Sequence, residues 1–186
     1  MPAGGLPMNA RGWGWAVAVG LAGAALLGLI SWSVIDHAVH YDELLHILSA
    51  RGLLQTGQLA IADGLYTRAE LFTRAVAWSF QRFGESPVAA RLPALAAGAT
   101  LVCMVGIWVV RRAGLLAGIS AVLLLCMVPT TVEVAVFARF YTLHTLVVTL
   151  VFIAVYEALQ PRRTPLWRIS CSAVAVSLLS VAWHLQ

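Results

Sequence analysis

Long apolar runs separated by short polar connections organise most of this chain of 186 residues. A helix needs roughly 20 apolar residues to cross a bilayer. Five runs are that long or nearly so: residues 13–35, 88–110, 115–134, 140–158 and 167–183. Because backbone polar groups in lipid must be satisfied internally, these runs predict helices. We therefore expect an all-α transmembrane bundle with about five spans, forming a single domain over residues 1–186.

One long polar stretch, residues 36–87, follows the first apolar run. Apolar residues recur at helical spacing over residues 42–54 and again over residues 69–83, where Trp and Phe are frequent. The second segment stops at Gly84, a residue type common at helix C-termini. We expect two amphipathic helices that lie along the membrane interface, within a loop outside the first span.

Composition supports the membrane class and excludes others. Hydrophobic residues make up 61% of the chain and charged residues 11%, whereas soluble domains carry about 25% charged residues. The net charge of +4 does not indicate nucleic-acid binding, because the basic residues are all arginine and lie dispersed at the ends of apolar runs. The cysteines lie inside apolar runs without CxxC spacing, so we assign no metal or redox role to them: Cys103, Cys126 and Cys171.

Arginine placement predicts the orientation in the membrane. The N-terminal tail and the short connections carry Arg11, Arg111-Arg112 and Arg162-Arg163, which the positive-inside rule places in the cytoplasm. The first run is too long for a signal peptide and is expected to remain as an anchor. We expect a multi-pass protein of the plasma (inner) membrane with a cytoplasmic N-terminus. The 36–87 loop then faces the periplasm or the outside.

Candidate site residues gather on that outer side. Asp42 and Glu43 stand where the first span ends, and helical spacing puts each on one face with His46. Acids in a first helical turn also stabilise the helix dipole, so a purely structural role stays open. A metal site built from Asp42 and His46 is a weaker alternative, and we assign no metal ligands. The topology also places these residues outside: Arg68, Glu133, Arg139 and His184.

The order of short motifs from Asp42 onward resembles the GT-C glycosyltransferases that use polyprenyl-phosphate sugars, best known from protein O-mannosyltransferases and lipid A aminoarabinose transferases. In that family an acidic motif follows the first span, then a Lys-Pro-Pro-Leu loop, a helix ending in Phe-Gly, and an Ala-Arg-Leu-Pro entry to the second span. A later Arg-x-Tyr motif opens the fourth span. The corresponding segments here are Asp42-Glu43, Arg68-Ala69-Glu70-Leu71, Phe83-Gly84, Ala90-Arg91-Leu92-Pro93 and Ala138-Arg139-Phe140-Tyr141.

Three departures from the family pattern matter. Ala69-Glu70 replaces the rigid Pro-Pro pair, and Tyr141 stands where some members carry a second acid. Family members have many more spans, so we interpret the chain as the N-terminal portion of a larger module. We expect this portion to be inactive by itself.

The resemblance implies transfer of a sugar from a polyprenyl-phosphate donor to an acceptor hydroxyl at the outer membrane face. Asp42 would act as the base, while Arg68 and Arg139 would clamp the phosphate, because a guanidinium fork matches phosphate oxygens. The acceptor would be a protein, a lipid such as lipid A, or a cell-envelope glycan. No cofactor is firmly implied, although a divalent cation is compatible with the reaction. Orienting groups would be Glu43, His46, Tyr141 and His184.

Two residues near these motifs have simpler interpretations. We expect Arg91 to extend its side chain to the lipid interface beside Pro93. An ionisable residue at membrane depth needs a partner, and Glu133 is the nearest candidate for Arg139.

Two other functions compete with the transferase. The chain could be a non-catalytic membrane subunit, or a truncated remnant, that packs against a partner. A transporter ranks last, because transporters place ionisable residues near the membrane midplane whereas the charges here lie at its boundaries.

Overall fold

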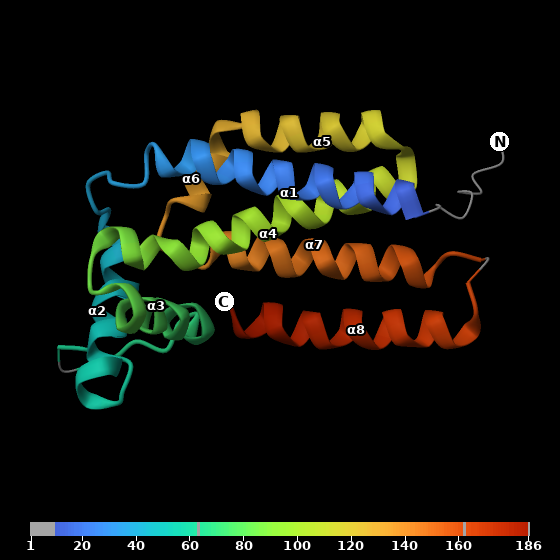
Figure 1. The fold of residues 1–186 in the computed structure, drawn as a ribbon. Helices are drawn as coiled ribbons and strands as arrows, with labels where there is room; N and C mark the ends of the chain where they lie inside the picture. The colour runs from blue at the N-terminus through green and yellow to red at the C-terminus, as the bar shows by residue number, and fades with distance from the viewer. Residues whose placement is uncertain (1–9, 63, 162, 186) are drawn as a thin grey trace. The chain divides into compact units, whose positions relative to one another are not determined.

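The computed structural model describes residues 10–62, 64–161 and 163–185 (Figure 1). These residues form eight helices and one short hairpin: α1 (Ala10–Trp32), α2 (Tyr41–Thr56), β1 (Ala60–Ile61), β2 (Gly64–Leu65), α3 (Glu70–Phe83), α4 (Pro87–Ala113), α5 (Leu115–Met127), α6 (Pro129–Ala135), α7 (Tyr141–Ala158) and α8 (Pro165–His184). The all-α prediction is confirmed in the described part of the chain, since only four residues there are in strands.

Among the described residues, four helices are long and apolar enough to cross a membrane: Gly12–Trp32 within α1, α4, α7 and α8. The predicted run at residues 115–134 is not one straight helix. It divides into α5 and α6, which are bent by 68° relative to each other. Pro129 explains the break, because proline disfavours helical backbone in the residue before it and suits the first position of a new helix. With this bent pair counted as one span there are five, as expected of a multi-pass membrane protein.

The described residues fall into two compact units. The first contains residues up to His37 together with Leu95–Phe137, and the second contains Ala38–Ala94 and residues from Ala138 onward. In the first unit α1, α5, α6 and most of α4 share a small core. Its buried members are Leu27, Val102, Val122, Cys126 and Ala135.

The second unit holds the loop predicted after the first span. Here α2, the hairpin and α3 pack with the start of α4 and with the antiparallel pair α7 and α8 (Figure 1). The hairpin lies directly against α2, since a Cβ on Gly52 would collide with the Ala60 carbonyl oxygen. Large members of the core come from α3 and from the residue before α7: Phe72, Val76, Phe80 and Phe140.

The two helices of this loop bury different kinds of residue. On α3 the apolar Phe72, Val76 and Phe80 are buried while Trp78 and Phe83 are exposed. On α2 the buried residues are Glu43, His46, Ser49 and Ala50. The apolar face expected over residues 42–54 is therefore not the buried face of α2, which is mostly polar. Buried polar groups need hydrogen-bond partners, and those partners define the candidate site.

Candidate functional site

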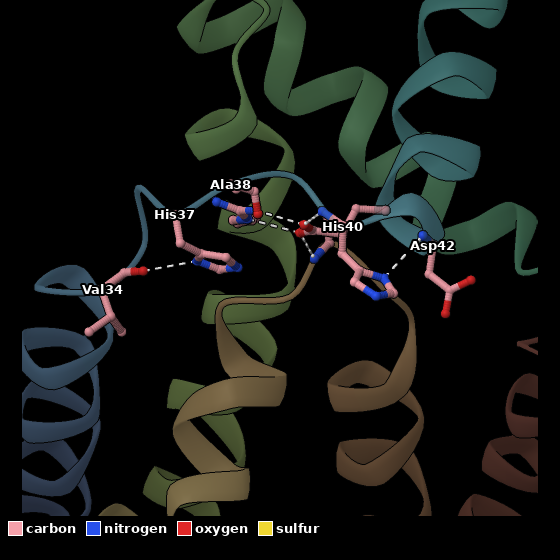
Figure 2. A network of polar contacts seen from close by, with 8 residues as sticks. Val34, His37, Ala38, His40 and Asp42 are labelled. Carbon is pink, nitrogen blue, oxygen red and sulfur yellow. Dashed lines mark hydrogen bonds and ion pairs between the residues drawn. The ribbon is translucent and has the colours of Figure 1, made fainter.

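The start of α2 sets the directions of the two acids. His40 precedes the helix with extended backbone, and its Nδ1 accepts a hydrogen bond from the Asp42 N–H at 3.3 Å. In return, the Glu43 carboxylate accepts from the His40 N–H at 3.0 Å. Figure 2 shows this cap, with the Asp42 carboxylate extending away from the His40 ring. This reciprocal cap satisfies N–H groups that the first turn leaves unpaired.

Glu43 is held by three parts of the second unit. Its carboxylate accepts two hydrogen bonds from the Arg91 guanidinium, at 2.8 and 2.6 Å, and one from the Ala138 N–H at 2.8 Å. Arg91 also donates to the Ala38 carbonyl at 3.3 Å. Both charged side chains are fully buried. The expectation that Arg91 extends to the lipid interface is therefore wrong, because its charge is neutralised inside the protein.

The protonation of Glu43 follows from these contacts. Burial raises the pKa of a carboxyl group, but here the hydrogen bonds from Arg91, Ala138 and His40, together with the Arg91 charge, outweigh burial. The pKa of Glu43 therefore lies below its usual value of 4.5. Protein donors occupy both carboxylate oxygens, so the contacts of Glu43 join α2, α4 and the segment before α7.

Asp42, the neighbouring acid, faces a different environment. Its Oδ1 lies 3.5 Å from Nη1 of Arg139, and its side chain is 43% exposed. The same Nη1 donates to the Asp42 carbonyl at 3.1 Å, and Nη2 donates to the Tyr141 hydroxyl at 3.0 Å. Arg139 is therefore paired with Asp42, which replaces the interpretation that Glu133 is its partner. Its side chain is only 7% exposed, and its buried Nε has no acceptor among the described residues.

Arg68 approaches the same place from the loop between β2 and α3. It is exposed, and its guanidinium carbon lies 5.9 Å from the centre of the Phe140 ring. The guanidinium carbon of Arg139 lies 5.8 Å from the same ring centre. The next residue, Ala69, has a φ of 49° in the left-handed region, where a residue with a Cβ is held at a cost of about 1 kcal/mol.

His46 lies deeper in the same unit and is fully buried. Its Nδ1 lies 2.8 Å from the Thr73 hydroxyl, and its ring meets Tyr66, Phe72 and Phe140 edge-on at centroid distances of 5.4, 5.2 and 6.2 Å. Burial lowers the pKa of His46 to about 4, with Arg139 and Arg68 acting in the same direction and Asp42 opposing them. His46 is therefore neutral at neutral pH.

Tyr66 is the site residue that the sequence analysis missed. Burial raises the pKa of its hydroxyl, while Arg139 and Arg68 oppose that rise. Its position two residues before Arg68, in a loop already singled out, was the available signal. Tyr66, His46 and the two arginines therefore share one electrostatic environment.

The structure brings together five of the predicted site residues: Asp42, His46, Arg68, Arg139 and Tyr141. His184, at the end of α8, is exposed, and no hydrogen bond or ion pair links it to them within the described ranges. In the same ranges no three His, Cys, Asp or Glu side chains form a cluster that could hold a metal ion.

This arrangement has a definite chemical capability. One partly exposed carboxylate stands beside a nearly buried guanidinium, with a second guanidinium in the adjacent loop. A carboxylate in such a place can accept a proton from a hydroxyl group, and guanidinium groups bind phosphate oxygens. Comparison with protein-family models, with curated proteins and with solved structures gives no match for this chain.

Proposed function

We propose that this protein is a membrane glycosyltransferase that moves a sugar from a polyprenyl phosphate to an acceptor hydroxyl. The observation that carries the proposal is the pairing of a partly exposed Asp42 with a nearly buried Arg139, with Arg68 beside the same Phe140 ring. The motif order that resembles GT-C enzymes supports it independently. In the resembling enzymes, these positions carry the acid and the cations of the reaction.

The proposed reaction is a single displacement. The acceptor oxygen forms a bond to the anomeric carbon while the bond from that carbon to the phosphate oxygen breaks. The electron pair of the broken bond leaves with the phosphate, and the hydroxyl proton passes to the Asp42 carboxylate. Inversion at the anomeric carbon follows, because the acceptor attacks from the side opposite the phosphate.

Arg139 and Arg68 would bind the phosphate and stabilise the charge that develops on it. The buried Nε of Arg139 retains an N–H without an acceptor among the described residues. A buried donor left unpaired costs about 1–3 kcal/mol, so an anionic ligand would remove that cost. Stabilisation of developing charge by fixed donors is a large term in catalysis.

We place the site at the extracytoplasmic face, with α2 and α3 along the membrane surface. The arginines of the short connections support this orientation. The exposed Leu71, Trp78 and Phe83 on α3 support contact with the lipid interface.

The decisive experiment is Asp42→Asn in the full-length protein, assayed for sugar transfer from undecaprenyl-phosphate-linked hexoses in native membranes. Loss of a general base typically lowers a rate by about 10²–10⁴, and we expect a loss of that size. Glu70→Gln is the matched control, because Glu70 is an exposed acid paired with Arg74 on α3. Transfer by Asp42→Asn at the rate of the control would remove Asp42 as the base.

A non-catalytic membrane subunit is the second candidate, favoured by one observation. Large apolar residues on α8 are exposed in the structure and would suit a protein partner as well as lipid: Leu166, Ile169, Val176, Leu179 and Trp183. That function predicts a stable partner in detergent extracts and a cellular phenotype that Asp42→Asn leaves unchanged.

A further inference from the structure

The His46 ring has one nitrogen that the protein satisfies and one that it does not. Nδ1 lies 2.8 Å from the Thr73 hydroxyl oxygen. Nε2 is buried and has no hydrogen-bond partner among the described residues. The ring itself is held by edge contacts with Tyr66, Phe72 and Phe140, so His46 cannot easily turn to bring Nε2 to another partner.

The second contact of Thr73 favours one His46 tautomer. Its hydroxyl donates to the Ala69 carbonyl at 3.5 Å, one helical turn earlier. A hydroxyl has a single proton, so when that proton is directed to the Ala69 carbonyl, the Thr73 oxygen accepts from Nδ1–H of His46. A neutral imidazole has one N–H, and in this tautomer Nε2 is a bare acceptor. The pKa of about 4 agrees with a neutral ring.

The surrounding charges limit what can donate to Nε2. Arg139 and Arg68 both act on His46 electrostatically, and their positive potential disfavours a cationic donor such as an ammonium group. An uncharged donor, such as a hydroxyl group, suits this environment. If the two arginines hold the phosphate of the donor lipid, the groups next to them are the hydroxyls of the attached sugar.

We propose that Nε2 of His46 accepts a hydrogen bond from a hydroxyl of the lipid-linked sugar, which makes His46 a sugar-recognition residue. This inference rests on the proposed glycosyltransferase function and adds a specificity determinant to it. The competing interpretation is that His46 only fills the core and ties α2 to α3 through Thr73.

Two substitutions separate these interpretations because they keep different halves of the imidazole. His46→Asn keeps a donor near the Nδ1 position, toward Thr73, and removes the acceptor at Nε2. His46→Gln places its amide near the Nε2 position and gives up the contact with Thr73. If His46 is only structural, His46→Gln should be the more damaging variant in both stability and binding assays. If His46 recognises the sugar, His46→Asn should be the more damaging variant in binding assays.

The binding experiment uses undecaprenyl phosphate and its glucose, galactose and mannose derivatives with the full-length protein in detergent. We expect the wild type to bind at least one hexose derivative more tightly than undecaprenyl phosphate. His46→Asn should reduce that preference by about tenfold and leave the affinity for undecaprenyl phosphate unchanged. His46→Gln should retain most of the preference despite a lower melting temperature. Equal preference in wild type and His46→Asn, or no preference in the wild type, overturns the inference.

A second measurement needs no ligand. Nitrogen-15 NMR of histidine-labelled protein, assigned with His46→Gln, should show Nδ1 protonated and Nε2 bare. A proton on Nε2 overturns the inference even if Asp42→Asn abolishes transfer. Conversely, Asp42→Asn could transfer sugar normally while the hexose preference still depends on His46. That result would contradict the proposed catalytic role of Asp42 and would still support a sugar-binding site at His46.

Discussion

Asp42 and Glu43 are adjacent in the chain, yet their carboxylates lie in opposite environments. The Glu43 side chain is fully buried against Arg91, while that of Asp42 is 43% exposed beside Arg139. Neighbouring positions on a helix point about 100° apart, so one acid can enter the packed interior while the other faces the surface. The acidic pair therefore divides into one structural group and one group available for chemistry.

This division predicts that Glu43→Gln destabilises the protein far more than Asp42→Asn. Breaking a buried ion pair typically costs about 3–5 kcal/mol, because the remaining charge is left uncompensated. A partly exposed pair contributes less than about 1 kcal/mol. Thermal unfolding of the purified variants in detergent checks the difference. Equal melting temperatures for the two variants would contradict the assignment of Glu43 to the fold.

His46 predicts a pH dependence of stability. Its pKa is about 4 in the folded protein against 6.5 for an ordinary histidine, so below 6.5 the unfolded chain takes up a proton that the folded chain does not. The contribution of His46 to the free energy of unfolding is therefore fully present above pH 6.5, and it is lost as the pH falls toward 4. Between about pH 7.5 and pH 5 the loss should reach roughly 2 kcal/mol.

The control for this effect is His46→Gln, which cannot titrate. Melting temperatures recorded in detergent from about pH 7.5 to pH 5 should fall more steeply for the wild type than for this variant. This pH range stays above 4.5, the ordinary pKa of the Glu43 carboxyl group, below which its protonation would also change the free energy of unfolding. Parallel curves for the two proteins would show that His46 is not the responsible group.

Arg68 predicts a change in lipid-phosphate binding without a change in stability. It is exposed, and its guanidinium carbon lies 5.9 Å from the centre of the Phe140 ring. Arg68→Ala should weaken binding of undecaprenyl phosphate severalfold and reduce its dependence on salt, since a charge pair with phosphate is screened by ions. Arg74→Ala, on the exposed side of α3, is the matched control. Equal affinities for the two variants would exclude Arg68 from the phosphate clamp.

The proposed orientation predicts a labelling pattern. After replacement of Cys103, Cys126 and Cys171 by alanine, a cysteine at exposed Ser86 should react with an impermeant thiol reagent in intact cells. A cysteine at Arg163 should react only after permeabilisation. The reverse pattern would place Asp42 on the cytoplasmic side and end the proposal of an extracytoplasmic site.

Much of the fold could be predicted from short stretches of the sequence. The segments predicted at residues 42–54 and 69–83 correspond to α2 and α3, because helical periodicity and Gly84 are local signals. The division of residues 115–134 into α5 and α6 was missed although Pro129 marks it. In that region the length of the apolar run outweighed the proline in the prediction.

Part of the site could also be predicted from the sequence, but from motifs instead of periodicity. Asp42, Arg68 and Arg139 were selected from their motifs, and the structure places them in one unit. The partner of Arg91 could not be predicted from the sequence, because Glu43 lies 48 residues away along the chain. Tyr66 was missed because it lies two residues before Arg68, outside the motifs on which the prediction relied.

By itself the amino-acid sequence determined that this is a helical membrane protein with a structured loop after its first span, since spans and helices follow from hydropathy and periodicity within short windows. Only the tertiary structure decided which acid is buried, which arginine neutralises it, and that Asp42 pairs with Arg139. Those pairings join residues from distant segments, and their energies depend on burial and distance after packing, neither of which a linear pattern contains.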